Sequence, residues 1–154
     1  MSAPELDIVK GRNFSGVQVG ALTGLDSYQF FHPLGKGRGF PGKLFLKDSL
    51  DMTGMELSLN KLPAGQGMPF YHRHREHEEL YIFLKGRGQF MVDGSVVDVQ
   101  EGSVIRVAPE GVRTWRNHSQ EDLYYIVIQA KAGTLQSGTI EDGVVSPERV
   151  SWPA

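Results

Sequence analysis

The sequence contains no cysteine among its 154 residues. This absence excludes disulfide bonds, cysteine-ligated zinc, iron–sulfur clusters and thiol nucleophiles, and it is compatible with a reducing compartment. A domain of this length removes roughly 70% of its unfolded surface from water, so a core can form without covalent or metal staples. The length is also that of about one domain.

The sequence also lacks a strong net charge and a long apolar run. Its formal net charge is −2, which does not indicate nucleic acid or an acidic membrane as a partner. No apolar run approaches the roughly 20 residues of a membrane span, and residues 1–14 lack the apolar segment of a secretory signal. These absences favour a soluble cytoplasmic protein.

No segment has the periodicity of an amphipathic helix, whereas short alternating runs separated by turn residues are frequent. Asp93-Gly94 is a two-residue signal for a hairpin turn. Short strands at even spacing are typical of a sandwich or a closed barrel, and hence of an all-β fold. The expected strands of this core cover residues 55–62, 79–84, 89–92, 95–99, 103–107, 113–117 and 123–130.

The ends of the chain are less regular than this core. Residues 1–54 form an N-terminal arm with additional strands expected at 28–32 and 43–46. Residues 131–154 form a C-terminal tail, predicted to lie on the barrel through apolar anchors at Val144, Val145, Val150 and Trp152. Since no domain boundary is visible, residues 1–154 are expected to form a single domain with its core at about 55–130.

The one dense group of ligand-capable side chains lies at residues 72–79, which read His-Arg-His-Arg-Glu-His-Glu-Glu. On an extended chain successive side chains point to opposite faces, so His72 and His74 leave it on the same side. A carboxylate from Glu78 or Glu79 follows after a short bend. Such mixed nitrogen and oxygen ligands suit Zn, Mn, Fe, Ni or Cu rather than Ca.

This group forms part of a longer spacing pattern, in which a glycine-rich lead-in is followed by His-x-His, four residues, a glutamate, six residues and a glycine. A second pattern farther along has a glycine, a Pro-x-Gly turn and an asparagine. The positions concerned are Gly65, Gly67, His72, His74, Glu79 and Gly86 in the first, and Gly102, Pro109, Gly111 and Asn117 in the second.

In these two motifs the chain resembles the cupin superfamily. The resemblance implies a jelly-roll barrel, also called a double-stranded β-helix, and it covers about residues 60–130. It selects Glu79 over Glu78, because of the distance to Gly86. It also implies that His72, His74 and Glu79 face the barrel interior, where cupins hold a divalent metal.

The chain departs from the cupin pattern at the histidine of the second motif. Counting from Gly102 places that position on Arg113, and counting from Gly111 places it on Thr114. A guanidinium cannot ligate a metal and adds positive charge beside the site. Arg113 is expected either to pair with Glu79 or to bind the carboxylate or phosphate of a small ligand. His77 is an alternative substitute for the missing ligand.

Three aromatic residues share the parity of the inward-facing positions, namely Tyr81, Phe83 and Trp115. They are interpreted as core residues that would also line an apolar pocket. With Arg113 they form the predicted ligand-binding set.

Two hypotheses about function remain open. The first is a metalloenzyme, since the resemblance includes oxygenases, decarboxylases and sugar isomerases that act on small anionic or sugar-like substrates. The second is a metal-free module in which Glu79 pairs with Arg113 and the barrel mouth binds a small anion. In either case the expected partner is a small molecule, and a homodimer is expected because the N-terminal segment could exchange strands with a second copy.

Overall fold

The computed structural model describes residues 3–33 and 36–154, and strands dominate it. The helical content of these residues is one 3₁₀ segment, η1 (Leu22–Ser27). No helix in this part of the chain is long and apolar enough to cross a membrane. The all-β fold class predicted from the sequence is confirmed.

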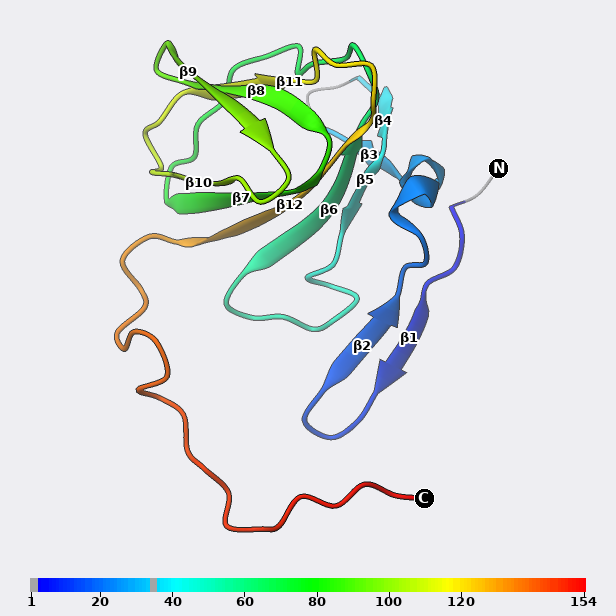
Figure 1. Cartoon of the computed structure of the whole chain (residues 1–154), viewed down its shortest axis with the longest axis vertical. Coiled ribbons are helices and arrows are strands. Elements are labelled where there is room, and N and C mark those ends of the chain that lie inside the picture. The colour runs from blue at the N-terminus through cyan, green and yellow to red at the C-terminus, as the bar shows by residue number, and fades with distance from the viewer. Residues whose placement is uncertain (1–2, 34–35) are drawn as a thin grey trace.

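Two antiparallel sheets form the barrel (Figure 1). The larger has the order β10-β7-β12-β6-β5, and the smaller, which lies over it in the figure, has the order β11-β8-β9. The expected core strands agree with the observed ones to within a few residues. The strands of the two sheets, including β5 from the N-terminal arm, are β5 (Lys43–Phe45), β6 (Glu56–Leu62), β7 (His77–Lys85), β8 (Arg87–Val92), β9 (Ser95–Gln100), β10 (Val104–Val107), β11 (Arg113–Arg116) and β12 (Leu123–Lys131).

The expected hairpin at Asp93-Gly94 joins β8 to β9. Val92 pairs with Ser95, so the loop has two residues. Both have positive φ, 49° for Asp93 and 84° for Gly94, as the type I′ turn requires. The Asp93 carboxylate also accepts the Val112 N–H at 2.9 Å. The turn therefore also helps to hold the start of β11.

Alternating burial along β7 places one face of this strand in the interior. Glu79, Tyr81 and Phe83 are buried, whereas the residues between them are partly exposed. Tyr81 meets Phe90 with ring centroids 4.6 Å apart and Trp115 at 5.2 Å. Aromatic pairs of this kind add about 0.5–1.5 kcal/mol each beyond their area burial. This aromatic core borders the inward-facing Glu79 along the same face of β7.

The N-terminal arm contributes two further strand pairs. Its first hairpin consists of β1 (Asp7–Lys10) and β2 (Ser15–Gln18), and projects from the barrel (Figure 1). The second pair is β3 (Gln29–Phe31) with β4 (Gly39–Pro41). The strands expected at 28–32 and 43–46 are thus confirmed, as β3 and β5.

The prediction that the C-terminal tail lies on the barrel was wrong. Its intended anchors are 84–94% exposed, and Figure 1 shows the chain after β12 running away from the sheets. The reason is that residues 132–154 form no strand, so their backbone makes no ladder with a sheet edge. Scattered apolar side chains alone do not select a docking position. The anchors concerned are Val144, Val145, Val150 and Trp152.

Candidate metal centre

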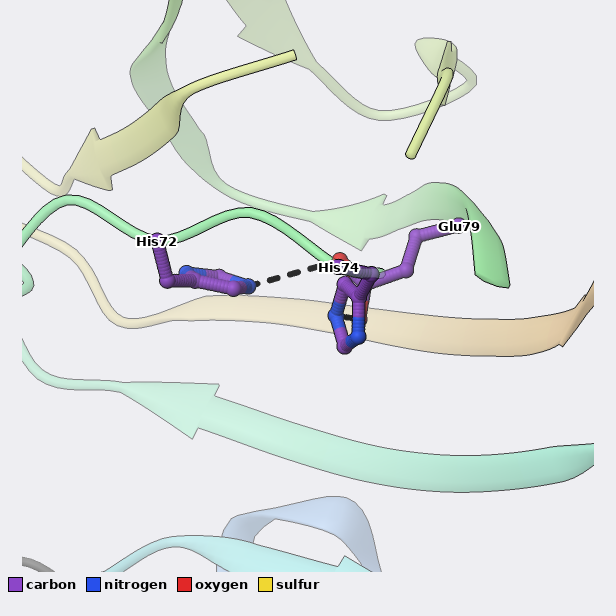
Figure 2. A group of neighbouring side chains, drawn as sticks. All are labelled: His72, His74 and Glu79. Atoms are coloured by element: carbon purple, nitrogen blue, oxygen red, sulfur yellow. Dashed lines mark ion pairs between the residues drawn. The ribbon is translucent and has the colours of Figure 1, made fainter. Parts of the chain in front are cut away.

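His72 and His74 lie in the extended segment that leads into β7, and backbone hydrogen bonds fix their position. His72 and Arg113 exchange N–H···O=C bonds of 3.0 and 3.1 Å. The His74 N–H donates to the Pro109 carbonyl at 3.0 Å. The two imidazoles lie on the same side of the chain, with ring centroids 5.4 Å apart (Figure 2), as the alternation of an extended chain predicts.

Glu79 extends from β7 toward both imidazoles (Figure 2). Its Oε1 lies 2.9 Å from His74 Nε2, and its Oε2 lies 3.6 Å from His72 Nε2. One ligand atom from each of the three side chains lies within 4.8 Å of the others. Ligands of a tetrahedral ion with bonds near 2 Å are about 3.3 Å apart, close to the separation of His74 Nε2 and Glu79 Oε1. His72, His74 and Glu79 therefore lie close enough to bind a metal.

Two buried ring nitrogens in this group, His72 Nδ1 and His74 Nε2, have no hydrogen-bond partner among the described residues. The contact of His74 Nε2 with Glu79 Oε1 has the distance of an ion pair but lacks the direction of a hydrogen bond. Buried polar atoms without a partner are rare, and a role in binding an ion is one ordinary explanation. A nitrogen lone pair beside a carboxylate oxygen fits Zn, Mn, Fe, Ni or Cu.

Arg113 is fully buried and pairs with Glu79. Its Nε and Nη2 both donate to Oε2, at 3.2 and 3.1 Å, and its Nη1 donates to the Gly111 carbonyl at 2.6 Å. The predicted pairing is thus present, but both donors share one oxygen instead of forming a parallel fork. The Tyr81 hydroxyl donates to the same Oε2. Oε1 is consequently the oxygen left for a metal.

The electrostatics of the group favour an ionised glutamate. Burial by itself raises the pKa of Glu79, but the imidazoles of His72 and His74 and the Tyr81 hydroxyl outweigh it and hold this pKa well below its usual range. Burial and the charge of Glu79 both raise the pKa of Tyr81. At neutral pH the pair is therefore a carboxylate and a neutral phenol.

Two neighbours of Glu79 take other partners. His77 Nδ1–H donates a hydrogen bond to Gln129 Oε1 at 2.9 Å, and its ring stacks on His74 with centroids 6.1 Å apart. Glu78 pairs with Arg106 at 2.7 Å. Neither His77 nor Glu78 belongs to the group of three ligand-capable side chains.

Of the two residues considered for the missing histidine position, Arg113 lies beside Glu79. Thr114 has the opposite parity on β11 and pairs with Met91 of β8. Counting from Gly102 therefore gives the residue that occupies the interior position.

The three predicted pocket aromatics all lie in the hydrophobic core. Trp115 meets the histidine group, with its ring 5.9 Å from that of His72. Its Nε1 donates to the Tyr125 hydroxyl at 2.9 Å. Phe83 packs deeper, against Tyr125 and Phe90. A role for these aromatics in lining a ligand pocket stays a prediction.

The asparagine and a glycine of the two motifs have structural roles. Asn117 is fully buried, and its Nδ2 donates to the carbonyls of Leu62 and Glu121 at 2.9 and 2.7 Å. Gly86 has φ +90°, and a Cβ there would lie 2.5 Å from the Asp122 carbonyl oxygen. Both residues hold the chain at the end of the barrel where β12 begins.

Sequence reasoning missed a second polar group in the interior. Lys43 of β5 donates to Ser58 Oγ at 3.0 Å and to Asn60 Oδ1 at 2.8 Å. Ser58 and Asn60 are 1% and 3% exposed. The alternation of residues 55–62 carried the signal, because Ser58 and Asn60 share the parity of the buried Leu62. No such signal marks Lys43, because it lies outside both motifs.

Comparison with known proteins places these observations in a family. A model of the Cupin domain matches residues 58–129. A solved cupin protein from Bacteroides fragilis has 43% sequence identity and a TM-score of 0.65, and the match covers 68% of this chain and 88% of that one. Comparison with curated proteins finds no match.

Two more distant structures are similar in fold alone. One is a putative sugar phosphate isomerase from Acidithiobacillus ferrooxidans, with 21% identity, a TM-score of 0.57 and coverage of 67% of this chain and 66% of that one. The other is a sugar phosphate isomerase from a cupin superfamily, from Silicibacter pomeroyi, with 18% identity, a TM-score of 0.53 and coverage of 59% and 60%.

Proposed function

Because the chain belongs to the cupin superfamily, we propose that it is a small-molecule-binding cupin that holds a divalent transition metal through His72, His74 and Glu79. The observation that carries the proposal is the convergence of these three side chains, with ligand atoms within 4.8 Å of one another. The unpartnered His74 Nε2, which lies 2.9 Å from Glu79 Oε1, supports it. The candidate ions are Zn, Mn, Fe, Ni and Cu.

A metal bound there would act as a Lewis acid toward a substrate oxygen. The chain's own residues prepare the site. Arg113 and Tyr81 hold Glu79 Oε2 and so direct Oε1 toward His74. The side chains of both histidines are partly exposed, which leaves the site open to a small molecule. Oxygenase, isomerase or decarboxylase chemistry on a small anionic or sugar-like substrate is the range we propose, since fold alone does not select a reaction.

Arg113 is expected to lower the metal affinity of this site below that of a site with four neutral or anionic ligands. It supplies a permanent positive charge at the position of the missing histidine, and it competes with the ion for the charge of Glu79. Water molecules would complete the coordination of a three-ligand site, as in catalytic metal centres that keep open positions.

The alternative function is a metal-free binding module. The observation that favours it is the pair of Arg113 with Glu79, which neutralises the buried carboxylate without any ion. The barrel mouth would then bind a small anion without turning it over.

Metal content separates the two functions. Protein purified without a tag and without added metal is analysed by plasma mass spectrometry beside the His72→Ala/His74→Ala double variant. The exposed His118 provides the control variant, His118→Ala. About one ion per chain in the wild type and the control, lost in the double variant, supports the metal site. Near-zero metal in all three, even after incubation with excess Mn, Fe, Ni and Zn, supports the binding module.

We also propose that residues 1–154 form one domain and that the protein is a homodimer. The N-terminal hairpin exposes Ile8, Val9 and Phe14, and its strands β1 and β2 pair with each other alone among the described residues. Apolar side chains on an open sheet edge are suited to pairing with a second chain. A light-scattering mass equal to one chain would contradict the homodimer.

A further inference from the structure

Lys43 is a half-buried cation whose direct polar partners are both neutral. Its Nζ donates to Ser58 Oγ and Asn60 Oδ1. It also lies 4.7 Å from the centroid of the Phe45 ring, an arrangement that attracts an ammonium weakly. Ser58 and Asn60 are in turn fixed by the Asn60 Nδ2 group, which donates to Ser58 Oγ and to two backbone carbonyls. The ammonium is therefore held by a prearranged polar group.

The pairing of strands places this group on the same face as the candidate metal centre. Lys43 pairs with Asn60, Asn60 with Tyr125, and Tyr125 with Phe83. Paired residues in adjacent strands point to the same face, and Phe83 shares the inward parity of Glu79. Ser58 pairs with Val127, which pairs with Tyr81, two residues from Glu79. Strand and residue spacings therefore put the backbones of Ser58 and Glu79 about 12 Å apart. The charge of Glu79 acts on Lys43 across this separation.

The ammonium of Lys43 makes no contact with a carboxylate among the described residues. Arg113 pairs with Glu79, and Glu56 accepts hydrogen bonds from the backbone N–H groups of Lys47 and Leu57. A buried ammonium without an anion is costly. Burial lowers the pKa of Lys43 to about 8, although Glu79 and Glu56 act in the opposite direction. Lys43 remains mostly protonated at neutral pH, and the two carboxylates that act on it, Glu79 and Glu56, form no ion pair with it.

We infer that Lys43, with Ser58 and Asn60, forms an anion site that binds the carboxylate of a small molecule whose other end reaches His72, His74 and Glu79. A single ammonium with two neutral neighbours matches one negative charge, whereas a phosphate dianion needs more donors than this group offers. The Ser58 hydroxyl can rotate to donate to the carboxylate beside the ammonium. The second half of this inference rests on the proposed function, whereas the anion site itself does not.

The test uses malonate as the probe and malonamide as its uncharged counterpart. Calorimetric titration at pH 7 compares the wild type with Lys43→Met, which removes the charge and keeps the length of the side chain, and with Lys43→Arg, which keeps the charge. Lys47→Met is the matched control, because Lys47 is exposed and its ammonium pairs with Asp48. Each titration is run on protein as purified and after removal of metal.

We expect malonate to bind the wild type and the control equally, and Lys43→Met at least about tenfold more weakly, the usual weight of a hydrogen bond to a charged group. Lys43→Arg should retain part of the affinity, and malonamide should not bind. In the wild type, amide resonances of residues 58 and 60 should shift on addition of malonate, a result that does not depend on any variant.

Equal malonate affinity of Lys43→Met and the wild type, or no binding to the wild type, would overturn the anion site. Metal content distinguishes this failure from failure of the proposed function, because Lys43 is not a ligand and its variant should keep any ion. Malonate binding that depends on Lys43 in protein that takes up no metal would support the anion site and contradict the metal centre.

Discussion

Replacement of Arg113 by methionine should test how much the pair with Glu79 stabilises the fold. The variant loses two hydrogen bonds to Glu79 Oε2 and one to the Gly111 carbonyl. Bonds that involve a charged group contribute about 1.5–3 kcal/mol each, and removal of one partner of a buried ion pair costs about 3–5 kcal/mol. Because Glu79 keeps the Tyr81 hydroxyl and the imidazoles, we expect the lower end, about 3 kcal/mol.

Urea unfolding measures this loss directly, and thermal unfolding should show a decrease of about 6–12 °C for a chain of this length. Arg106→Met is the matched control, because Arg106 pairs with Glu78 on the outer face, where the two side chains are 57% and 38% exposed. Exposed pairs of this kind contribute about 0–1 kcal/mol. A loss below about 1 kcal/mol for Arg113→Met, or equal losses for both variants, would refute the energetic role assigned to the buried pair.

Three further outcomes follow from the same contacts. Arg113→His removes a permanent charge beside the site and adds an imidazole, so Ni²⁺ or Zn²⁺ affinity measured by calorimetry should rise at least about tenfold; unchanged or weaker binding would contradict the position assigned to Arg113. His77→Ala should leave metal content unchanged, because His77 is bonded to Gln129, and loss of the ion would make His77 a ligand. The pKa of Lys43 is about 8 in the fold and 10.5 ordinarily, so the unfolded chain binds more protons between these values and stability should rise with pH there. The free energy of unfolding of the wild type should therefore increase relative to Lys43→Met by up to about 3 kcal/mol from pH 8 to 10.5, and parallel pH profiles would show that the ammonium is not desolvated.

The barrel strands were predictable because the information is local. Alternation along residues 79–84 and the Asp93-Gly94 turn each act within a few residues, and β7 and the β8–β9 hairpin follow from them. The interior position of His72, His74 and Glu79 followed from the cupin spacing, as did the approach of Arg113 to Glu79. The cupin spacing did not predict that two Arg113 donors and the Tyr81 hydroxyl share Oε2. That arrangement depends on side-chain rotamers set by the packed core.

Two features depend on contacts that the sequence does not encode locally. Lys43 reaches the interior only because β5 pairs with β6 in the register that sets Lys43 opposite Asn60. The apolar composition of residues 131–154 predicts contact with the barrel surface, but composition does not specify a partner surface. Their exposed apolar side chains belong to a segment whose position no strand pairing determines.

The central claim, that His72, His74 and Glu79 together bind a transition metal, is tested most directly by anomalous diffraction at the absorption edge of the ion found in the protein. The account predicts one anomalous peak per chain, bonded to both imidazoles and to Glu79 through Oε1, with Arg113 still on Oε2. A peak at another place in the chain, or crystals grown in excess metal that show none at these three residues, would contradict it.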